Sequence, residues 1–460
     1  MSDVEVLVIG GGPAACTAAI EAARTGKRVA IVMEERVGGR ATFASMVPSK
    51  VFLHAAERRR HRGELQQGLA DEAAMTAIHH EVQSFSARVS SRWSDRLEDV
   101  GVRRIEGVAK FNSTHQASVA RTGKEPLTLD FVSAIIATGS VPFFPESEGF
   151  FGPELKGPDG VHILTPRHLS TLTSLPKTML VVGGGVTGAE MVHAFTSLGV
   201  EVSWMMDDLG ILPRFDRELA SSLGDVLMER GAKLIHGKRV MSVIKQGGGV
   251  QARLDGGRTY EAERAFVAIG RTPDTSRLGL ELAGVEVHPR GSIPVDALGR
   301  TNVPHIYAVG DATGASFTTT KSCAEAYAAA RSATGQDVRE PVREAWIEAV
   351  FTDPEVARVG MTPEEGARRG RSFEVCAVGF DASLRGMLDG AGTDKHARGI
   401  LKVVFGDDGT VLGGIAIGRG AVEALTPVAT ALHLGAKREQ LRGLFLASPS
   451  LSEMGLEAFR

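Results

Sequence analysis

Two segments of the chain share one pattern of apolar and polar positions. In the first, an apolar run over residues 4–9 enters a glycine-rich turn, an alanine-rich stretch over residues 16–25 follows, and a second apolar run occupies residues 28–33. Short β-branched runs indicate buried strands, and the longer alanine-rich stretch indicates a helix. The pattern therefore predicts a strand, a helix and a second strand parallel to the first.

The same order of elements returns in the middle of the chain. An apolar run over residues 178–182 meets a second glycine-rich turn, a predicted helix extends to Leu198, and a predicted strand ends at Met205. Alternation of strands with helices is typical of a parallel sheet in an α/β fold.

Small residues in both turns follow the spacing GxGxxG/A of a dinucleotide-binding turn. The first position makes the tight turn, the second lets the backbone approach a pyrophosphate, and the third lets the helix pack closely on the strand. The helix N-terminus then offers free N–H groups to the phosphates. Because both turns link a predicted strand to a predicted helix, we interpret them as two dinucleotide sites and not as structural turns. Their positions are Gly10, Gly12 and Ala15, and Gly183, Gly185 and Gly188.

The second strand of each unit should end in an acidic residue that binds a ribose. Met33 and Met206 occupy those positions, and Glu34 and Asp207 follow them directly. Either a shift of one residue lets the two acids bind ribose, or they are exposed loop residues. Asp207 and the adjacent Asp208 would repel a 2′-phosphate, which favours NADH over NADPH.

Further apolar runs end in turns that carry small or polar residues. Two of them close at residues 135–139 and 267–271, and a third ends in Gly310-Asp311 before a predicted helix at 319–332. Asp311 could bind the ribityl hydroxyls of a flavin, or it could cap a helix.

The pattern changes near residue 346. Strand-like runs at 399–405 and 413–417 precede a predicted helix at 421–434, and this α+β segment carries no nucleotide motif.

Composition narrows the possible functions. The chain has 460 residues, of which 43% are hydrophobic, so two or three domains are expected. Its net charge of −3 gives no basis for binding nucleic acid or a membrane surface. The three cysteines form no CxxC pair, and no HExxH spacing occurs, so neither a disulfide scaffold nor a metal site is expected.

Neither a basic leader nor a membrane-spanning run is visible, so we expect a cytoplasmic protein. The charged run at 57–62 is interpreted as a solvated helix face, with an acidic partner as the lesser alternative.

In the order and spacing of these motifs, the chain resembles the flavoprotein disulfide reductases, the class I pyridine nucleotide-disulfide oxidoreductases. The resemblance extends almost from end to end, and it also rests on Gly38-Gly39, Pro48-Ser49-Lys50 and the segment 270–274. It implies an α/β fold with two Rossmann-like domains and a C-terminal α+β dimerisation domain, and hence a homodimer. The implied domains are FAD-binding at 1–150, NAD(P)-binding at 151–272, a return to FAD at 273–345, and the interface at 346–460.

The resemblance also implies which residues bind the cofactors, FAD and NADH. They comprise the motif positions and several residues at strand and helix ends. The set is Gly10, Gly12, Ala15, Glu34, Gly39, Lys50, Ala109, Thr138, Gly139, Gly183, Gly185, Gly188, Asp207, Gly270, Asp311 and Thr319.

The sequence departs from the family at the centre of its chemistry. Ala41 and Met46 occupy the positions of the two redox-active cysteines, and neither side chain can form a disulfide or a thiolate. Ser448 occupies the position of the C-terminal histidine, while the glutamate of that motif remains as Glu453. Serine is too weak an acid or base to replace an imidazole. The half-reaction that reduces a disulfide is therefore missing.

The residues that serve the nucleotide half-reaction remain. In the family, a lysine beside the flavin N5 pairs with a glutamate after the second glycine turn, and Lys50 and Glu190 match them. They would support hydride transfer, although a purely structural ion pair is the alternative. The helix at Thr319 would favour the anionic reduced flavin. Val186 is small where some members carry an aromatic gate.

These observations leave three hypotheses. The leading one is an FAD-dependent NADH oxidoreductase whose flavin reduces a quinone or another small acceptor directly. A second is a flavin- and nucleotide-binding subunit without turnover, with a structural or sensing role. A third is thiol chemistry that uses the sulfur of a partner or substrate. Cys16 and Cys323, on different predicted helices, are interpreted as small buried hydrophobes, with a substitute redox pair as the alternative.

Overall fold

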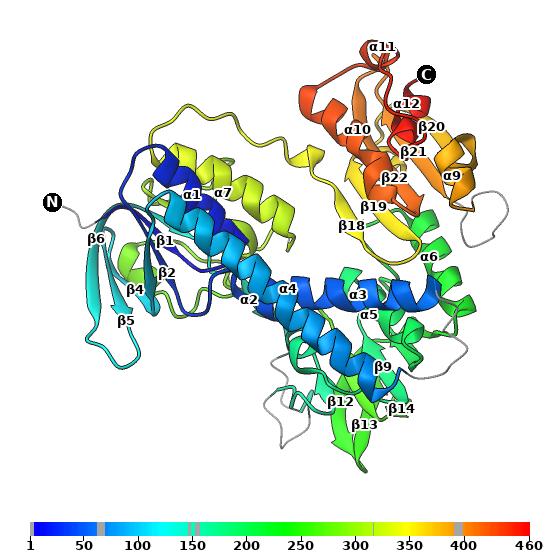
Figure 1. The fold of residues 1–460 in the computed structure, drawn as a ribbon, viewed down its shortest axis with the longest axis horizontal. Helices are drawn as coiled ribbons and strands as arrows, with labels where there is room; N and C mark the ends of the chain where they lie inside the picture. The colour runs from blue at the N-terminus through cyan, green and yellow to red at the C-terminus, as the bar shows by residue number, and fades with distance from the viewer. Residues whose placement is uncertain (1–3, 62–69, 146–148, 152–156, 316, 391–398) are drawn as a thin grey trace.

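The computed structural model describes residues 4–61, 70–145, 149–151, 157–315, 317–390 and 399–460. Three packed units make up the fold (Figure 1), each with its own central sheet. Two of the sheets are built around parallel strands flanked by helices, and the third, at the C-terminus, is antiparallel. The predicted α/β fold with a C-terminal α+β unit is confirmed.

The first sheet contains the strand–helix–strand unit predicted at the N-terminus. β1 (Val4–Ile9) pairs in parallel with β2 (Val29–Met33) and with β6 (Leu127–Ile136), so β1 lies at the centre of the sheet. α1 (Pro13–Arg24) connects β1 to β2 and packs against α7 (Thr319–Ala333). The remaining strands are β3 (Arg103–Glu106), β4 (Val108–Ser113), β5 (Gln116–Ala120) and β17 (Ile306–Ala308).

α1 begins three residues earlier than the sequence pattern predicts. Pro13 occupies its first turn, where the missing N–H of proline costs nothing. Because α1 starts directly after Gly12, its N-terminus faces the glycine turn.

The second sheet repeats this arrangement. Its strands are all parallel, in the order β11-β10-β9-β15-β8, and α5 (Val186–Ser197) links the two strands predicted for this unit. The bounds are β8 (Ile163–Leu164), β9 (Thr178–Val182), β10 (Glu201–Met205), α6 (Arg217–Glu229), β11 (Lys233–Ile235) and β15 (Arg264–Val267). A separate antiparallel sheet holds β12 (Val240–Gln246), β13 (Gly249–Leu254) and β14 (Thr259–Ala262), and a two-stranded ribbon holds β7 (Ser140–Pro142) and β16 (Arg271–Pro273).

The C-terminal unit is a five-stranded antiparallel sheet in the order β18-β19-β22-β21-β20. α10 (Ala421–Leu434) covers it, with the bounds predicted from the sequence. The remaining elements are β18 (Glu348–Val350), β19 (Glu355–Gly360), α8 (Pro363–Arg368), β20 (Glu374–Gly379), α9 (Leu384–Leu388), β21 (Ile400–Phe405), β22 (Val411–Gly418), α11 (Arg438–Leu441) and α12 (Glu453–Phe459).

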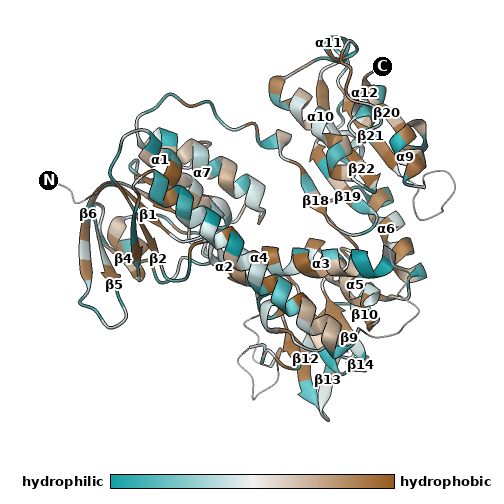
Figure 2. Cartoon of the chain, viewed as in Figure 1, coloured by the Kyte–Doolittle hydropathy of each residue, from teal (hydrophilic) through white to brown (hydrophobic). Residues whose placement is uncertain are grey.

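Helix α3 (Met46–His61) joins the three units. It follows the short α2 (Gly39–Phe43), lies between α4 (Glu72–Asp99) and α5, and shares one hydrophobic core with the second sheet and with β18, β19 and β22. Figure 2 shows the apolar residues gathered along the strands, while α4 carries both hydrophilic and hydrophobic residues. In the described ranges, no helix combines the length and the apolar character needed to cross a membrane.

The charged run at the end of α3 is not the solvated face that the sequence pattern predicts. Arg58 donates to Glu81 of α4 at 2.8 Å, Arg59 donates to the carbonyl oxygen of Leu198, and Arg60 pairs with Asp353. Because α3 lies between the units, its arginines meet acids and carbonyl groups of the neighbouring elements. Arg62 lies outside the described residues.

Candidate functional site

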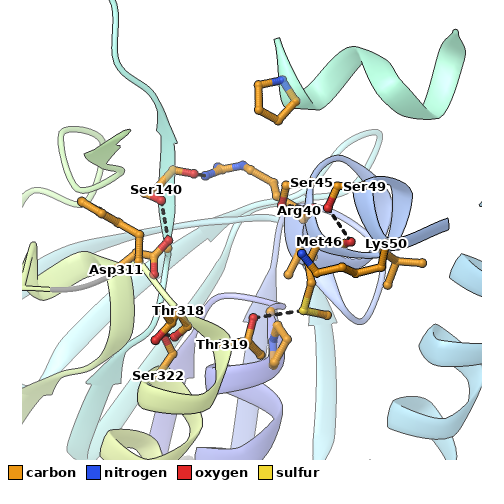
Figure 3. A pocket seen from close by; sticks show the side chains of 18 of the residues that line it. Arg40, Ser45, Met46, Ser49, Lys50, Ser140, Asp311, Thr318, Thr319 and Ser322 are labelled. Carbon is orange, nitrogen blue, oxygen red and sulfur yellow. Dashed lines mark hydrogen bonds between the residues drawn. The ribbon is translucent and has the colours of Figure 1, made fainter. Parts of the chain in front are cut away.

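A cavity of about 1340 Å³ connects the first sheet to α3, α5 and the start of the C-terminal unit. Figure 3 shows part of it, between the N-terminus of α7 and the start of α3. The cavity brings together most of the site residues predicted from the sequence. They are Gly10, Gly12, Glu34, Gly39, Lys50, Ala109, Thr138, Gly139, Glu190, Asp311 and Thr319.

The predicted residues outside this lining divide into two kinds. Ala15 is fully buried where α1 packs on the strands, as the third position of a dinucleotide turn requires. The others belong to the second unit, where they lie in the turn between β9 and α5, in the first turn of α5, and just after β10 and β15. They are Gly183, Gly185, Gly188, Asp207 and Gly270.

The first glycine turn has the geometry of a phosphate-binding turn. Gly10 has a φ of +131°, and a Cβ atom there would come within 2.2 Å of the carbonyl oxygen of Ala137. A Cβ atom on Gly12, in contrast, would meet no described atom within 4 Å, and no described side chain caps the first turn of α1. The open side of Gly12 and the uncapped helix N-terminus both favour an anionic ligand at this point.

The second glycine turn repeats this geometry. Gly183 has a φ of +120°, and a Cβ atom there would come within 2.3 Å of the Ala268 carbonyl oxygen. A Cβ atom on Gly188 would come within 2.0 Å of the Gly183 carbonyl oxygen, which accepts a hydrogen bond from Trp204 Nε1 at 2.9 Å. Both turns therefore have the close backbone contacts that a dinucleotide-binding unit needs.

The part of the cavity wall around Asp311 and Thr319 fits the polyol and ring portions of a flavin. Asp311 accepts a hydrogen bond of 2.5 Å from Ser140 Oγ (Figure 3), and Ser140 Oγ accepts one of 2.6 Å from Arg271 Nε. α7 starts at Thr319 beside this network, and no side chain in the described segments caps its first turn. The cavity therefore offers two positive helix termini and the Asp311 carboxylate, which match the phosphates, ring and hydroxyls of FAD.

Glu34, just past the end of β2, already has a cationic partner. Arg277 donates to its two carboxylate oxygens at 2.9 and 2.6 Å. The hydrogen bond from Arg277 lowers the pKa of Glu34 and keeps this carboxylate charged at the cavity wall. The preceding Met33 is buried, and the contact of Glu34 with a ribose stays a prediction.

Asp207 occupies the matching place after β10. Met206 is buried, whereas Asp207 is partly exposed and accepts a hydrogen bond of 3.2 Å from the Leu209 N–H. Asp207 therefore lies one residue after the position expected for a ribose-binding acid, and its contact with a ribose stays a prediction.

The pair predicted from Lys50 and Glu190 is present. Lys50 Nζ donates to both carboxylate oxygens of Glu190, at 2.7 and 2.8 Å, and Glu190 is only 4% exposed. Phe351, next to β18, holds the pair from the third unit. Its N–H donates to Glu190 Oε1 at 3.0 Å, and Lys50 Nζ lies 4.6 Å from the centre of its ring.

The two positions without cysteine lie in the same cavity wall as Lys50. Ala41 and Met46 both line the cavity, and the Met46 sulfur accepts a hydrogen bond of 3.2 Å from Thr319 Oγ1 (Figure 3). A thioether and a methyl group therefore line the cavity where the family carries two thiols.

The remaining cysteines of the first unit lie on α1 and α7. Cys16 and Cys323 are free, and neither lines the cavity. Burial raises the pKa of the Cys16 thiol to about 12, and it also raises the pKa of Cys323. A raised pKa disfavours the thiolate, so we expect both thiols to react slowly near neutral pH.

The C-terminal motif lies away from this cavity within the chain. Ser448 is exposed, and Glu453 accepts a hydrogen bond of 2.9 Å from the Ser450 N–H at the start of α12. Across the described ranges, no three His, Cys, Asp or Glu side chains are placed to hold a metal ion.

Sequence reasoning missed several cavity residues. Arg277 and Phe351 contact Glu34 and Glu190 from positions 243 and 161 residues away, and no local pattern marks them. His193 lines the cavity one helical turn after Glu190, and its place could have been inferred from the spacing on the same helix.

Two family models match the chain and together span almost all of it. One is described as pyridine nucleotide-disulphide oxidoreductase and matches residues 4–333. The other is described as the dimerisation domain of the same group and matches residues 347–459.

Curated relatives with different activities are similar to the chain. A dihydrolipoyl dehydrogenase 2 of Haloarcula marismortui is 31% identical over 469 residues, which cover 99% of this chain and 95% of the relative. An NAD(P)H dehydrogenase (quinone) of Mycobacterium tuberculosis is 32% identical over 473 residues, with 99% and 93% covered.

Solved structures agree with these matches. LpdA from Mycobacterium tuberculosis has a TM-score of 0.90 at 30% identity, with 99% of each chain covered. The HOCl-induced flavoprotein disulfide reductase RclA from Escherichia coli has a TM-score of 0.84 at 25% identity, again with 99% of each chain covered.

Proposed function

The chain belongs to the pyridine nucleotide-disulphide oxidoreductase family, and from this premise we propose that it transfers electrons from NADH, by way of FAD, to a quinone or another small acceptor. In the proposed reaction no protein disulfide takes part. The chain acts as a homodimer, because residues 347–459 match the family's dimerisation domain and Leu444, Phe445 and Leu446 are exposed apolar residues in that unit.

A single observation carries this proposal. The Lys50–Glu190 ion pair is present and bidentate in the same cavity where Ala41 and Met46 replace the thiols. A chain that had lost all redox function would have no need for a buried carboxylate paired with a lysine at this place. Burying Glu190 is costly unless it stays paired, so the retained pair favours a working nucleotide half-reaction.

Each residue of the pair has a separate task in this reaction. Bound FAD would accept a hydride from the nicotinamide and release two electrons to the acceptor. Lys50 holds a positive charge at the cavity wall and stabilises negative charge that develops there. Glu190 keeps Lys50 charged and oriented, and the Phe351 N–H fixes the carboxylate. The N-terminus of α7 adds a second positive end beside Thr319.

The proposed acceptor is planar and largely apolar. Ala41, Met46 and Val186 present apolar groups to the cavity, and such a surface suits a quinone ring better than a charged or bulky disulfide substrate. A relative of 32% identity is named NAD(P)H dehydrogenase (quinone), which supports this choice.

NADH is the proposed electron donor. Asp207 and Asp208 follow β10, where the ribose of the nicotinamide dinucleotide would lie. Their charges would repel the additional phosphate of NADPH, and NADH carries no such group.

Rapid mixing under anaerobic conditions tests the proposal. NADH should bleach the flavin absorption of the holoenzyme within the time of one turnover, and NADPH should do so more slowly. Addition of a water-soluble quinone should then restore the absorption, whereas oxidised lipoamide should not. Absence of bleaching with either nucleotide would support a subunit without turnover, and reoxidation that requires an added thiol would support sulfur chemistry.

A further inference from the structure

The cavity continues beyond the Lys50–Glu190 pair toward a group of titratable side chains that the proposed reaction does not yet use. This second end is formed by α3, by α5 and by the start of the C-terminal unit. Its polar lining residues are His54, Glu57, Arg60, His193, Asp353 and Glu355.

One face of α3 leads from the ion pair to the protein surface. Lys50, His54 and Glu57 follow one another at helical spacing, and all three line the cavity. At 1.5 Å per residue, Lys50 and Glu57 are about 10 Å apart along the helix axis. The side chains of His54 and Glu57 are 60% and 42% exposed, so this end of the cavity meets solvent.

Glu355 lies in this second end, at the first position of β19. It accepts hydrogen bonds from backbone N–H groups at the start of α10, those of Ala421 and Val422. Its other oxygen, Oε2, is buried and has no hydrogen-bond partner among the described residues. Glu355 is therefore a carboxyl group with one oxygen left for a proton or a solvent molecule.

The surroundings of Glu355 favour its protonated form. Burial, with the nearby carboxylates Glu423 and Glu57, raises its pKa to about 7. An ordinary carboxyl group carries no proton at neutral pH, whereas Glu355 can gain and lose one there. The charged side chains that act on it are Glu423 of α10 and Glu57 of α3, and His54, Arg60, His193 and Arg419 line the same cavity.

His193 occupies the inner part of the same cavity, one helical turn after Glu190 on α5. Its side chain is 2% exposed, and Nδ1 bonds to no group in the described segments. Burial lowers its pKa to about 3, so the imidazole stays neutral and cannot hold the proton itself. It lies on the same helix as Glu190, whose carboxylate binds Lys50.

The proposed reaction needs a proton that NADH does not bring. Reduction of a quinone to a quinol takes two electrons and two protons, and a hydride carries two electrons with one proton. The second proton must come from solvent through a group that titrates near neutral pH. In the family pattern a histidine manages protons, but Ser448 occupies its place here.

We propose that Glu355 takes up this second proton from solvent and supplies it, through the cavity, to the reduced acceptor. The Glu355 carboxyl gives its proton to the reduced acceptor anion by way of solvent in the cavity, so one O–H bond of the carboxyl breaks and one O–H bond of the quinol forms, while Lys50 stays charged. Solvent then reprotonates the Glu355 carboxylate. The sum is NADH, one proton and quinone giving NAD⁺ and quinol, and this inference rests on the proposed function.

Two acceptors separate proton delivery from electron transfer. A water-soluble quinone needs protons, whereas ferricyanide takes single electrons and no proton. With quinone, wild-type turnover should fall as the pH rises through about 7, and Glu355→Gln should lower it about 10-fold and abolish this bend. With ferricyanide, the same substitution should change turnover by less than about 2-fold. Glu355→Asp should keep the bend, and Glu439→Gln, an exposed change on α11, should behave as wild type.

A second readout does not depend on turnover. Infrared spectra of the protein should contain a protonated carboxyl band that titrates near neutral pH and is absent from Glu355→Gln. Absence of this band from the wild-type protein would overturn the inference, as would an equal loss of turnover with both acceptors. A wild-type enzyme that reduces quinone, with Glu355→Gln unchanged, contradicts the relay alone. A wild-type holoenzyme that does not reduce quinone contradicts the proposed function, and the relay with it.

Discussion

Lys50 donates hydrogen bonds to both carboxylate oxygens of Glu190, at 2.7 and 2.8 Å, although 140 positions separate the two residues along the chain. The contact joins α3 to α5, and the Phe351 N–H fixes it from the third unit. Elements of all three units therefore hold this pair in place. In this account, electron transfer from NADH depends on the pair.

Substitutions in this pair should slow the reaction with NADH. We expect Lys50→Met to lower the rate of flavin reduction about 100-fold, since it removes a charge from the cavity wall. Glu190→Gln should cost about 10-fold, because it keeps hydrogen bonding but removes the charge that holds the ammonium. Anaerobic stopped-flow absorption measures both rates, and Arg368→Met on α8 is the control. Rates equal to wild type would mean that the pair is purely structural.

Glu34 and Arg277 give a prediction about cofactor affinity. If Glu34 binds the FAD ribose, Glu34→Gln should raise the dissociation constant of FAD about 10-fold, the loss typical of hydrogen bonds to a charged acceptor. Arg277→Ala should have a smaller effect that shrinks as salt is added, because both partners are about half exposed. Release of flavin fluorescence measures the affinity. Unchanged binding by Glu34→Gln would show that the acid is only a loop residue.

Parts of the site could be predicted from the sequence because local geometry demands particular residues. Gly10 and Gly183 have positive φ values, and a Cβ atom at either position would clash with a carbonyl group just past a neighbouring strand. Only glycine fits there, so the two positions mark both turns in the sequence. The Lys50–Glu190 contact could be expected from the family resemblance, and the structure confirms it.

Other parts could not be predicted, because they depend on contacts between distant elements. The charge pattern of α3 predicts a solvated face, yet Arg59 donates to the Leu198 carbonyl oxygen and Arg60 pairs with Asp353. A pattern of charges does not reveal that another element supplies the acids and carbonyl groups. The same holds for Arg277, which reaches Glu34 across 243 positions.

Thiol reactivity should follow burial. Cys16 and Cys323 have raised pKa values because they are buried, so neither should react quickly with a thiol reagent near neutral pH. Cys376 on β20 is partly exposed and should account for the fast reaction of the native chain. Titration with a chromogenic disulfide should therefore find one fast thiol, none in Cys376→Ser, and three in the unfolded wild-type chain. A fast thiol remaining in Cys376→Ser would reopen the question of a redox cysteine.

The buried His193 should make stability depend on pH. Burial lowers its pKa in the folded state from 6.5 to about 3, so protonation favours the unfolded chain. Above about pH 6.5 the imidazole is neutral in both the folded and the unfolded chain, so it does not change the free energy of unfolding. Below that value the free energy of unfolding falls as the pH decreases, by at most about 1.4 kcal/mol per pH unit. His193→Gln should flatten this dependence in urea unfolding between about pH 5 and 7. His80→Gln, on an exposed face of α4, should not. Identical slopes in all three proteins would contradict a neutral buried imidazole.

The central claim is that electrons leave from the flavin and that no protein disulfide stores a second pair. Anaerobic titration of the holoenzyme with NADH, followed by absorption spectroscopy, tests it most directly. We predict that one NADH per FAD bleaches the flavin band completely, with no thiolate–flavin charge-transfer band, and that a quinone then restores the oxidised spectrum. Uptake of two NADH per FAD, or a charge-transfer band at the halfway point, would contradict the account.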